Sequence, residues 1–174
     1  MNVNLLSDTE AEQLRQLIAE AEHIVICAHK SPDGDAIGSS LAWKSYLKQI
    51  GKTDVTVCMP DAYPDFLQWL PEANTILRYD KHPDRVQQVF DNADLVCCLD
   101  FNQYTRVEDM RPILEGCKAK RILIDHHLEP ETNNAITVSN PNMSSTSEMV
   151  FYIISQLGGY DGMTKECAQC IYCG

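Results

Sequence analysis

The sequence predicts one α/β domain with a mostly parallel sheet and helices on both of its faces. Short apolar segments alternate with segments of helical periodicity along most of the chain, and this alternation is typical of parallel sheets. The strand segments are nearly continuous apolar runs, which suits strands buried on both faces. A chain of 174 residues can bury a sizeable core and is the length of one domain.

The first half of the chain is predicted to contain helices and strands in alternation. A capping box of Ser7 and Glu10 marks the start of the first helix, and Gly51 ends the second. The second strand stops at Pro60, and an aromatic, proline-punctuated region follows it. In order, we expect a helix at 8–22, a strand at 23–29, a helix at 36–50, a strand at 54–60, a mixed region at 61–83 and a short helix at 84–90.

The second half is predicted to add strands first and helices last. The strands are again short apolar runs, whereas a run of serine and threonine opens the penultimate helix and two glycines end it. Thr164 is a suitable N-cap for the last helix. In order, we expect strands at 93–101, 120–127 and 134–140 and helices at 144–159 and 164–174.

Composition limits the classes of function. The formal net charge of −11 argues against capture of nucleic acid by a broad basic surface, although bound cations can invert the charge of a local site. No segment approaches about 18 consecutive apolar residues, and the N-terminus lacks the pattern of a signal peptide. We therefore expect a cytoplasmic protein with no membrane partner.

The eight cysteines are expected to be free thiols, because their spacing is not that of a disulfide framework. Cys27, Cys97 and Cys98 lie in apolar runs and are predicted to be buried in the core. Cys167 and Cys170 begin a spacing of three that ends at Cys173, but no further cysteine or histidine follows to complete a tetrahedral zinc site. The sequence does not favour structural zinc.

Polar residues with metal-binding side chains follow three of the predicted strands. In open α/β sheets, ligands bind beyond the carboxyl ends of the strands. If the three strands are adjacent and parallel, all of these side chains meet at one edge of the sheet. They are His29, Asp33 and Asp35 after the first strand, Asp100 after the third, and Asp125, His126 and His127 after the fourth.

Each segment also has an ordinary structural interpretation. Residues 31–36, SPDGDA, are typical of a turn, and an aspartate such as Asp100 often ends a strand. The adjacent His126 and His127 are harder to explain in this way, because histidine is not a favoured turn residue. The recurrence of ligand-type residues at three strand ends favours a metal site.

The residue types indicate which metal. Carboxylates and imidazoles without a thiolate suit Mn, Mg, Fe or Co. Seven candidate ligands exceed the need of one ion, which favours two ions that share a carboxylate, as in enzymes of phosphoryl transfer. Four carboxylates crowded together would repel one another without cations.

Three segments resemble the first three motifs of the DHH phosphoesterase superfamily: HKSPDGDAIGS, LDFNQYTR and IDHH. The resemblance is closest to the nanoRNase/pAp phosphatase group, with RecJ-type exonucleases and cyclic-dinucleotide phosphodiesterases as relatives. It implies the DHH phosphoesterase fold and a manganese-dependent hydrolase of short oligoribonucleotides, pAp or cyclic or linear dinucleotides. Two Mn²⁺ ions would be the cofactors, with Mg²⁺ or Co²⁺ as substitutes.

The resemblance also implies a set of ligands. His29, Asp33 and Asp100 would hold the first ion. Asp35, Asp100 and His126 would hold the second, so that Asp100 bridges the pair.

Further roles follow from the same resemblance. His127 would face the scissile phosphate, and Asp125 would orient a neighbouring imidazole. Arg106 is either a phosphate clamp or a member of a surface salt bridge. The residues 144–147 before a helix are expected to cap it, with phosphate contact as the alternative.

The sequence departs from the family pattern at its end. The family's fourth motif supplies a further aspartate ligand, and a smaller substrate-binding domain follows; neither is present in 1–174. We therefore expect a truncated catalytic domain with weak or no activity of its own. An inorganic pyrophosphatase and a catalytically compromised metal- or nucleotide-binding fragment remain alternatives, although the leading helix favours the nuclease-like group. A homodimer is also left open.

Overall fold

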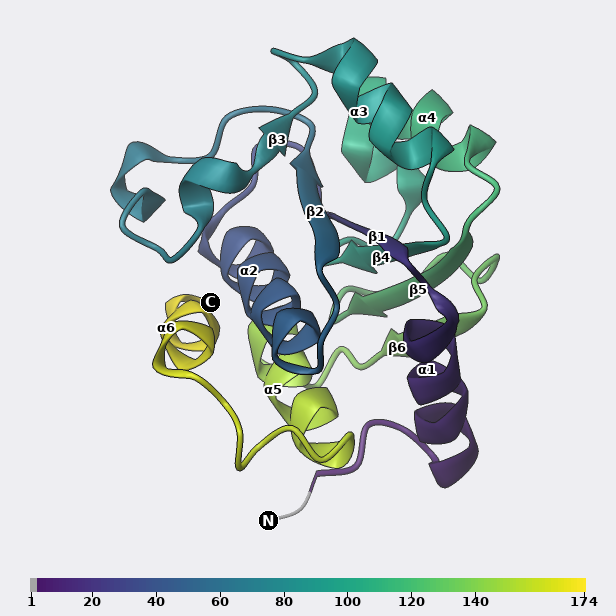
Figure 1. Cartoon of the computed structure of the whole chain (residues 1–174), viewed down its shortest axis with the longest axis vertical. Helices are drawn as coiled ribbons and strands as arrows, with labels where there is room; N and C mark the ends of the chain where they lie inside the picture. The colour runs from purple at the N-terminus through teal and green to yellow at the C-terminus, as the bar shows by residue number, and fades with distance from the viewer. Residues whose placement is uncertain (1–2) are drawn as a thin grey trace.

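The computed structural model describes residues 3–174 and contains a six-stranded sheet between two layers of helices (Figure 1). The strand order is β3-β2-β1-β4-β5-β6, and every neighbouring pair is parallel. The predicted α/β class is therefore confirmed. The strands are β1 His23–Cys27, β2 Asp54–Met59, β3 Leu77–Arg78, β4 Leu95–Leu99, β5 Lys120–Asp125 and β6 Ile136–Ser139.

The strand order reverses between β1 and β4. From β1 the chain builds outward through β2 to β3, then returns to the other side of β1 and builds outward again through β4, β5 and β6. In open α/β sheets, the connections on the two sides of such a point diverge, and ligands bind there, beyond the carboxyl ends of the strands. The topology therefore fixes where a ligand site belongs before any side chain is considered.

Helices cover both faces of the sheet, as predicted. One face carries α1, α2, α5 and α6, and the other carries α3, α4 and the 3-10 segment η3 (Figure 1). The helices are α1 Asp8–Glu20, α2 Gly34–Gln49, α3 Pro83–Asp91, α4 Arg111–Gly116, α5 Thr146–Gln156 and α6 Lys165–Cys173; η3 is Tyr104–Met110.

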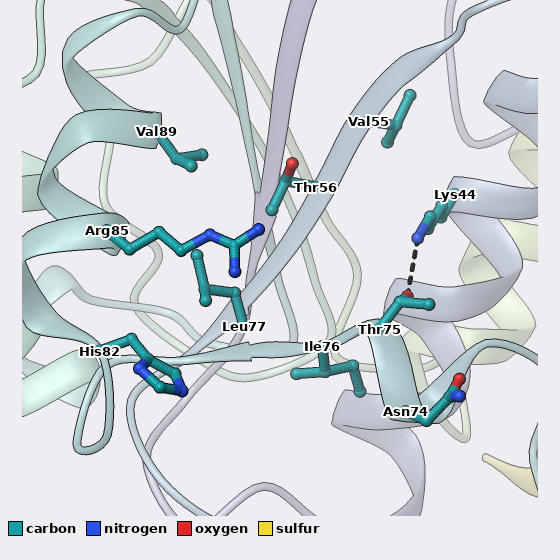
Figure 2. Close-up of a pocket in the computed structure, with 10 residues that line it drawn as sticks. All are labelled: Lys44, Val55, Thr56, Asn74, Thr75, Ile76, Leu77, His82, Arg85 and Val89. Carbon is teal, nitrogen blue, oxygen red and sulfur yellow. Dashed lines mark hydrogen bonds between the residues drawn. The ribbon is translucent and has the colours of Figure 1, made fainter.

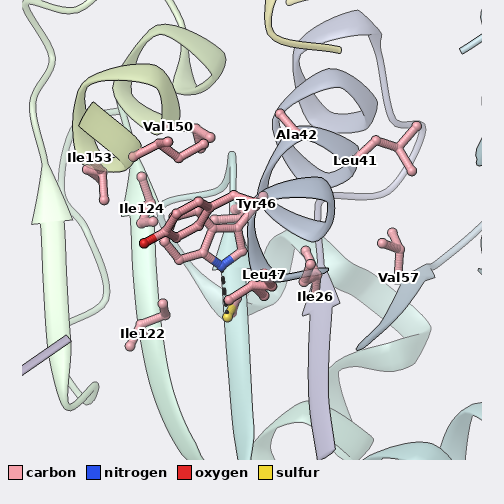
Figure 3. Close-up of a cluster of buried hydrophobic side chains, with 14 of the residues drawn as sticks. Ile26, Leu41, Ala42, Tyr46, Leu47, Val57, Ile122, Ile124, Val150 and Ile153 are labelled. Atoms are coloured by element: carbon pink, nitrogen blue, oxygen red, sulfur yellow. Dashed lines mark hydrogen bonds between the residues drawn. The ribbon is translucent and has the colours of Figure 1, made fainter. Parts of the chain in front are cut away.

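The larger core lies between the sheet and the layer formed by α1, α2, α5 and α6. Apolar side chains alternate between the two faces of each strand, so Ile24 and Ile26 of β1 join this core while Val25 and Cys27 join the other. Figure 3 shows part of the larger core, in which α2 packs against strands and α5 through Leu41, Tyr46, Leu47, Ile122, Ile124, Val150 and Ile153.

Most of the predicted helices and strands are present, but some begin or end at other residues than predicted. The capping box of Ser7 and Glu10 is formed, but α1 ends before residue 22 and β1 before residue 29. The helix predicted at 36–50 begins at Gly34, because Asp33 caps it. The sequence interpretation missed β3, η3 and α4, and left the mixed region 61–83 without its short 3-10 turns at Asp65–Leu67 and Ala73–Thr75.

The cysteines are free thiols, as expected. Cys27, Cys97 and Cys98 are fully buried in the strands. Cys167 and Cys170 are buried where α6 packs on α2, and the Cys167 thiol donates to the carbonyl of Ala42 at 3.5 Å. Within residues 3–174, no helix is long and apolar enough to cross a membrane.

Close packing of α6 on α2 depends on Gly38. A Cβ at this position would lie 2.6 Å from the Cys170 carbonyl oxygen, a backbone atom that cannot move without shifting α6. Gly38→Ala is therefore expected to lower the free energy of unfolding by about 1–3 kcal/mol. Gly116→Ala is the matched control, because a Cβ there meets nothing within 4 Å and should stabilise the fold by about 0.4–1 kcal/mol. Urea unfolding of both variants checks this; equal stability would contradict it.

Candidate metal centre

Polar side chains from three neighbouring strands meet at the carboxyl edge of the sheet. His29 follows β1, Asp100 follows β4, and Asp125 ends β5. Since β4 pairs with β1 on one side and with β5 on the other, these ends lie side by side at the point where the strand order reverses. The expected convergence of the strand ends is confirmed.

Asp100 lies at the centre of this edge. Its backbone is left-handed, with a φ of 62°, and the residue is only 2% exposed. A left-handed backbone is unfavourable for residues with a Cβ, though aspartate tolerates it better than most, and such strain concentrates at functional sites. Its amide donates to the carbonyl of Ile124 at 3.1 Å. The carboxylate lies between His29 and His126.

The two oxygens of Asp100 face different partners. Oδ2 lies 3.4 Å from Nε2 of His29. Oδ1 lies 3.8 Å from Nε2 of His126 and 4.0 Å from Nδ1 of His127. One carboxylate therefore belongs to two clusters of possible metal ligands, which are His29, Asp33 and Asp100, and Asp100, His126 and His127.

The first cluster is arranged by the start of α2. Asp33 Oδ1 accepts from the backbone amides of Asp35 and Ala36, which caps the helix, and it lies 3.9 Å from Nε2 of His29. Nδ1 of His29 donates to the carbonyl of Lys30 at 2.8 Å, so Nε2 is the nitrogen that faces both carboxylates. This is the usual orientation of a metal-binding histidine.

The second cluster is arranged by β5 and α5. Nδ1 of His126 donates to the carbonyl of Met143 at 3.3 Å, and its Nε2 lies 3.7 Å from Asp35 Oδ2. Asp35 therefore lies beside the second cluster, next to His126. The two oxygens of Asp35 accept the backbone amides of Ser147 and Thr146, each at 2.8 Å.

Asp125 orients His127. Its carboxylate is fully buried, and it accepts both Nδ1 of His127 at 2.6 Å and the His127 backbone amide at 2.9 Å. The proton of the imidazole is thereby held on Nδ1, which leaves Nε2 free at a side chain that is 40% exposed. The expectation that Asp125 holds a neighbouring imidazole agrees with this geometry.

The electrostatics of the cluster favour a cation. Burial raises the pKa of Asp100 above its ordinary value, despite the opposing hydrogen bond from His29. Burial lowers the pKa of His29, but hydrogen bonds to Asp100 and the Lys30 carbonyl outweigh it, and the pKa is raised overall. The charge of the nearby Asp35 also raises the pKa of Asp100, so the ionised carboxylate is disfavoured even with His29 beside it. Carboxylate and imidazole donors without thiolate, grouped around it, fit a hard divalent metal ion.

Arg106 is not brought into either cluster. Its backbone carbonyl accepts the amide of Lys30 at 2.9 Å, which joins η3 to the segment after β1, while its side chain is exposed. The structure places the arginine on a segment that borders the first cluster.

The start of α5 contributes more than the sequence indicated. Ser145 caps the helix by accepting the amide of Glu148 at 3.0 Å, as expected for this serine-rich segment. The hydroxyl of Thr146 donates to Asp100 Oδ1 at 3.0 Å, a contact that sequence reasoning missed. The capping signal was visible, but nothing in it showed which carboxylates the helix would approach.

A cavity of about 520 Å³, drawn in Figure 2, is lined by none of these residues. It borders Val55 and Thr56 at the start of β2, the segment that leads into β3, and Arg85 on α3. The carboxyl edge of the sheet lies at the other end of these strands. The polar cluster and not this cavity is the candidate site.

Comparison with known proteins identifies the family of this chain. The DHH family, N-terminal domain, matches residues 23–174. A relative from Thermus thermophilus, named bifunctional oligoribonuclease and PAP phosphatase NrnA, is 36% identical over 135 residues, which is 78% of this chain and 37% of the relative.

Solved structures show the same fold. An exopolyphosphatase-related protein from Bacteroides fragilis is 41% identical with a TM-score of 0.95, and the match covers 99% of this chain and 50% of that protein. RecJ from Thermus thermophilus in complex with Mn²⁺ has a TM-score of 0.52 at 17% identity, over 92% of this chain and 22% of RecJ. The chain thus spans half or less of these relatives. It belongs to the DHH family, whose N-terminal domain extends over residues 23–174.

Proposed function

We propose that this chain is a phosphoesterase domain that binds two Mn²⁺ ions and hydrolyses short oligoribonucleotides or pAp. The observation that carries the proposal is Asp100, whose two oxygens face two different ligand clusters. The relative from Thermus thermophilus is named for both substrates, and RecJ of the same fold binds manganese. Cyclic and linear dinucleotides belong to the same substrate class.

The proposed ligands divide between the two clusters. His29 and Asp33 would hold one ion, and Asp35 and His126 the other, with Asp100 shared. When bound, such a pair of ions stabilises negative charge on a phosphoryl group and activates water for in-line attack. Carboxylate and imidazole side chains are suitable donors for manganese.

The chain's own residues would position the substrate and move a proton. Asp125 keeps the proton of His127 on Nδ1, so Nε2 of this half-exposed imidazole can face the scissile phosphate. A protonated His127 could then donate a proton to the leaving oxygen. We propose Arg106 as the clamp for a second phosphate, since guanidinium groups pair well with phosphate oxygens and η3 borders the first cluster.

Ion binding is the first test, because all of the ligands proposed above lie within this chain. Isothermal titration of the metal-free chain with Mn²⁺ is expected to give two ions per chain. Mn²⁺-dependent release of mononucleotides from a diribonucleotide, or of phosphate from pAp, is the second readout. Pyrophosphate and polyphosphate are the comparison substrates.

Two results would contradict the proposal. Absence of Mn²⁺ binding at millimolar concentration would overturn the metal centre. Two bound ions with hydrolysis of pyrophosphate or polyphosphate, and none of the nucleotides, would keep the centre and overturn the substrate class.

A further inference from the structure

We propose that Thr146 is a positioning residue that sets the spacing of the second ligand cluster. The inference rests on the proposed metal centre and extends it to a residue outside the set of ligands. Thr146 is the first residue of α5 and is completely buried. It contacts both carboxylates that flank His126.

One residue donates to two carboxylates from two different strand ends. The Thr146 amide donates to Asp35 Oδ2 at 2.8 Å, and its hydroxyl donates to Asp100 Oδ1 at 3.0 Å. These same two oxygens are the ones nearest Nε2 of His126, at 3.7 and 3.8 Å. Two of the three donors proposed for the second ion, Asp35 and Asp100, are therefore held by a single residue.

The contact with Asp100 also fixes the orientation of its carboxylate plane. With Oδ1 tied to Thr146, Oδ2 is left facing His29 at 3.4 Å. A partial rotation of the carboxylate about its Cβ–Cγ bond would break this hydrogen bond between two buried residues. Hydrogen bonds are stronger in such surroundings, and unpaired polar groups cost more. The hydroxyl thus keeps the bridging geometry.

The helix supplies the fixed support that this role needs. Asp35 accepts amides from the first two residues of α5, where the unpaired amides and the helix dipole favour a carboxylate. Ser145 fixes the start of the helix as its cap. Each oxygen of Asp35 accepts one amide and keeps lone-pair capacity for a cation. The start of α5 therefore orients both carboxylates and leaves lone pairs on their oxygens for a cation.

Three variants test the role. Thr146→Val keeps the size of the side chain and the backbone amide but removes the hydroxyl. Thr146→Ser restores the hydroxyl, and Thr56→Val makes the same chemical change at a half-buried position in β2, away from the carboxylates. Mn²⁺ binding is followed by titration and by electron paramagnetic resonance, which distinguishes coupled pairs of ions from single ions.

We expect Thr146→Val to raise the Kd of the second Mn²⁺ by about 10–100-fold, the usual effect of losing a group that orients a ligand. The first ion should bind as in the wild type, and the signal of coupled ions should fall. Thr146→Ser and Thr56→Val should keep both ions. Far-ultraviolet circular dichroism verifies folding, and Thr146→Ala replaces the valine variant if that one does not fold.

The outcomes separate this inference from the proposed function. If the wild type binds two ions and the variants without the hydroxyl bind them equally well, the role of Thr146 is overturned and the metal centre stands. If Thr146→Ser loses the second ion as the valine variant does, the hydroxyl is not responsible and the inference also fails. If the wild type binds no ion, the proposed function fails and this inference fails with it.

Discussion

Asp100→Asn is expected to abolish binding of both Mn²⁺ ions and, at the same time, to stabilise the metal-free protein. The shared carboxylate loses its charge, so both clusters lose a ligand. The Kd of each ion should rise by more than the roughly 10–100-fold that loss of an orienting group costs. Mn²⁺ titration and thermal unfolding of the metal-free protein measure the two effects.

The stabilisation follows from the pKa of Asp100. Burial raises it, so in the folded protein the ionised carboxylate is unfavourable at neutral pH. An asparagine is neutral, tolerates the left-handed backbone, and can still accept from Thr146. The gain in Tm should be present at pH 7 and vanish as the pH falls through the raised pKa, because wild-type Asp100 is then protonated too.

Asp109→Asn is the matched control for this experiment. Asp109 is exposed on η3, so its substitution should leave ion binding and Tm nearly unchanged. Retention of both ions by Asp100→Asn would show that Asp100 is not the bridging ligand.

Trp43→Ala is expected to cause the largest loss of stability. Trp43 is fully buried on α2, packs against Tyr46 with ring centroids 5.3 Å apart, and donates from Nε1 to the Cys97 thiol at 3.4 Å. Truncation of a buried tryptophan costs about 3–5 kcal/mol, a large part of the roughly 5–15 kcal/mol that stabilises a typical domain. For a chain of this length, Tm should fall by roughly 6–20 °C.

Trp69→Ala provides the control, because Trp69 is 60% exposed and its loss should change stability by less than about 0.5 kcal/mol. Differential scanning calorimetry of both variants gives the comparison. Similar values of Tm for the two would mean that the α2 face of the sheet does not dominate the stability of the domain.

The sequence predicted most of the fold because its signals are local. The apolar runs of β1, β4 and β5 are buried on both faces, and such runs predict central parallel strands. β3 was missed because it is only the two residues Leu77–Arg78, too short for any periodicity. The segment with η3 and α4 was missed for a related reason: η3 contains Glu108 with non-helical φ and ψ, so no continuous helical period marks it.

The candidate ligand residues were more predictable than the residues that hold them in position. The position of His29, Asp100 and Asp125 at strand ends can be read from the sequence, since parallel strands present their carboxyl ends at one edge. The contact of Thr146 with Asp100 joins residues that are far apart in the chain. It depends on how α5 packs, which no local pattern specifies.

The parallel topology also has a consequence for folding kinetics. Ile24 of β1 pairs with Val55 on one side and with Leu95 on the other, and pairings between such distant residues form slowly because long loops must close first. The ligand clusters draw on β1, β4 and β5, so neither exists in a chain that has assembled only its first half. An ion that binds only the finished fold stabilises it by mass action. Metal ions would then bind after the last steps of folding and would slow unfolding. The metal-bound domain would therefore stay folded for longer than the metal-free domain.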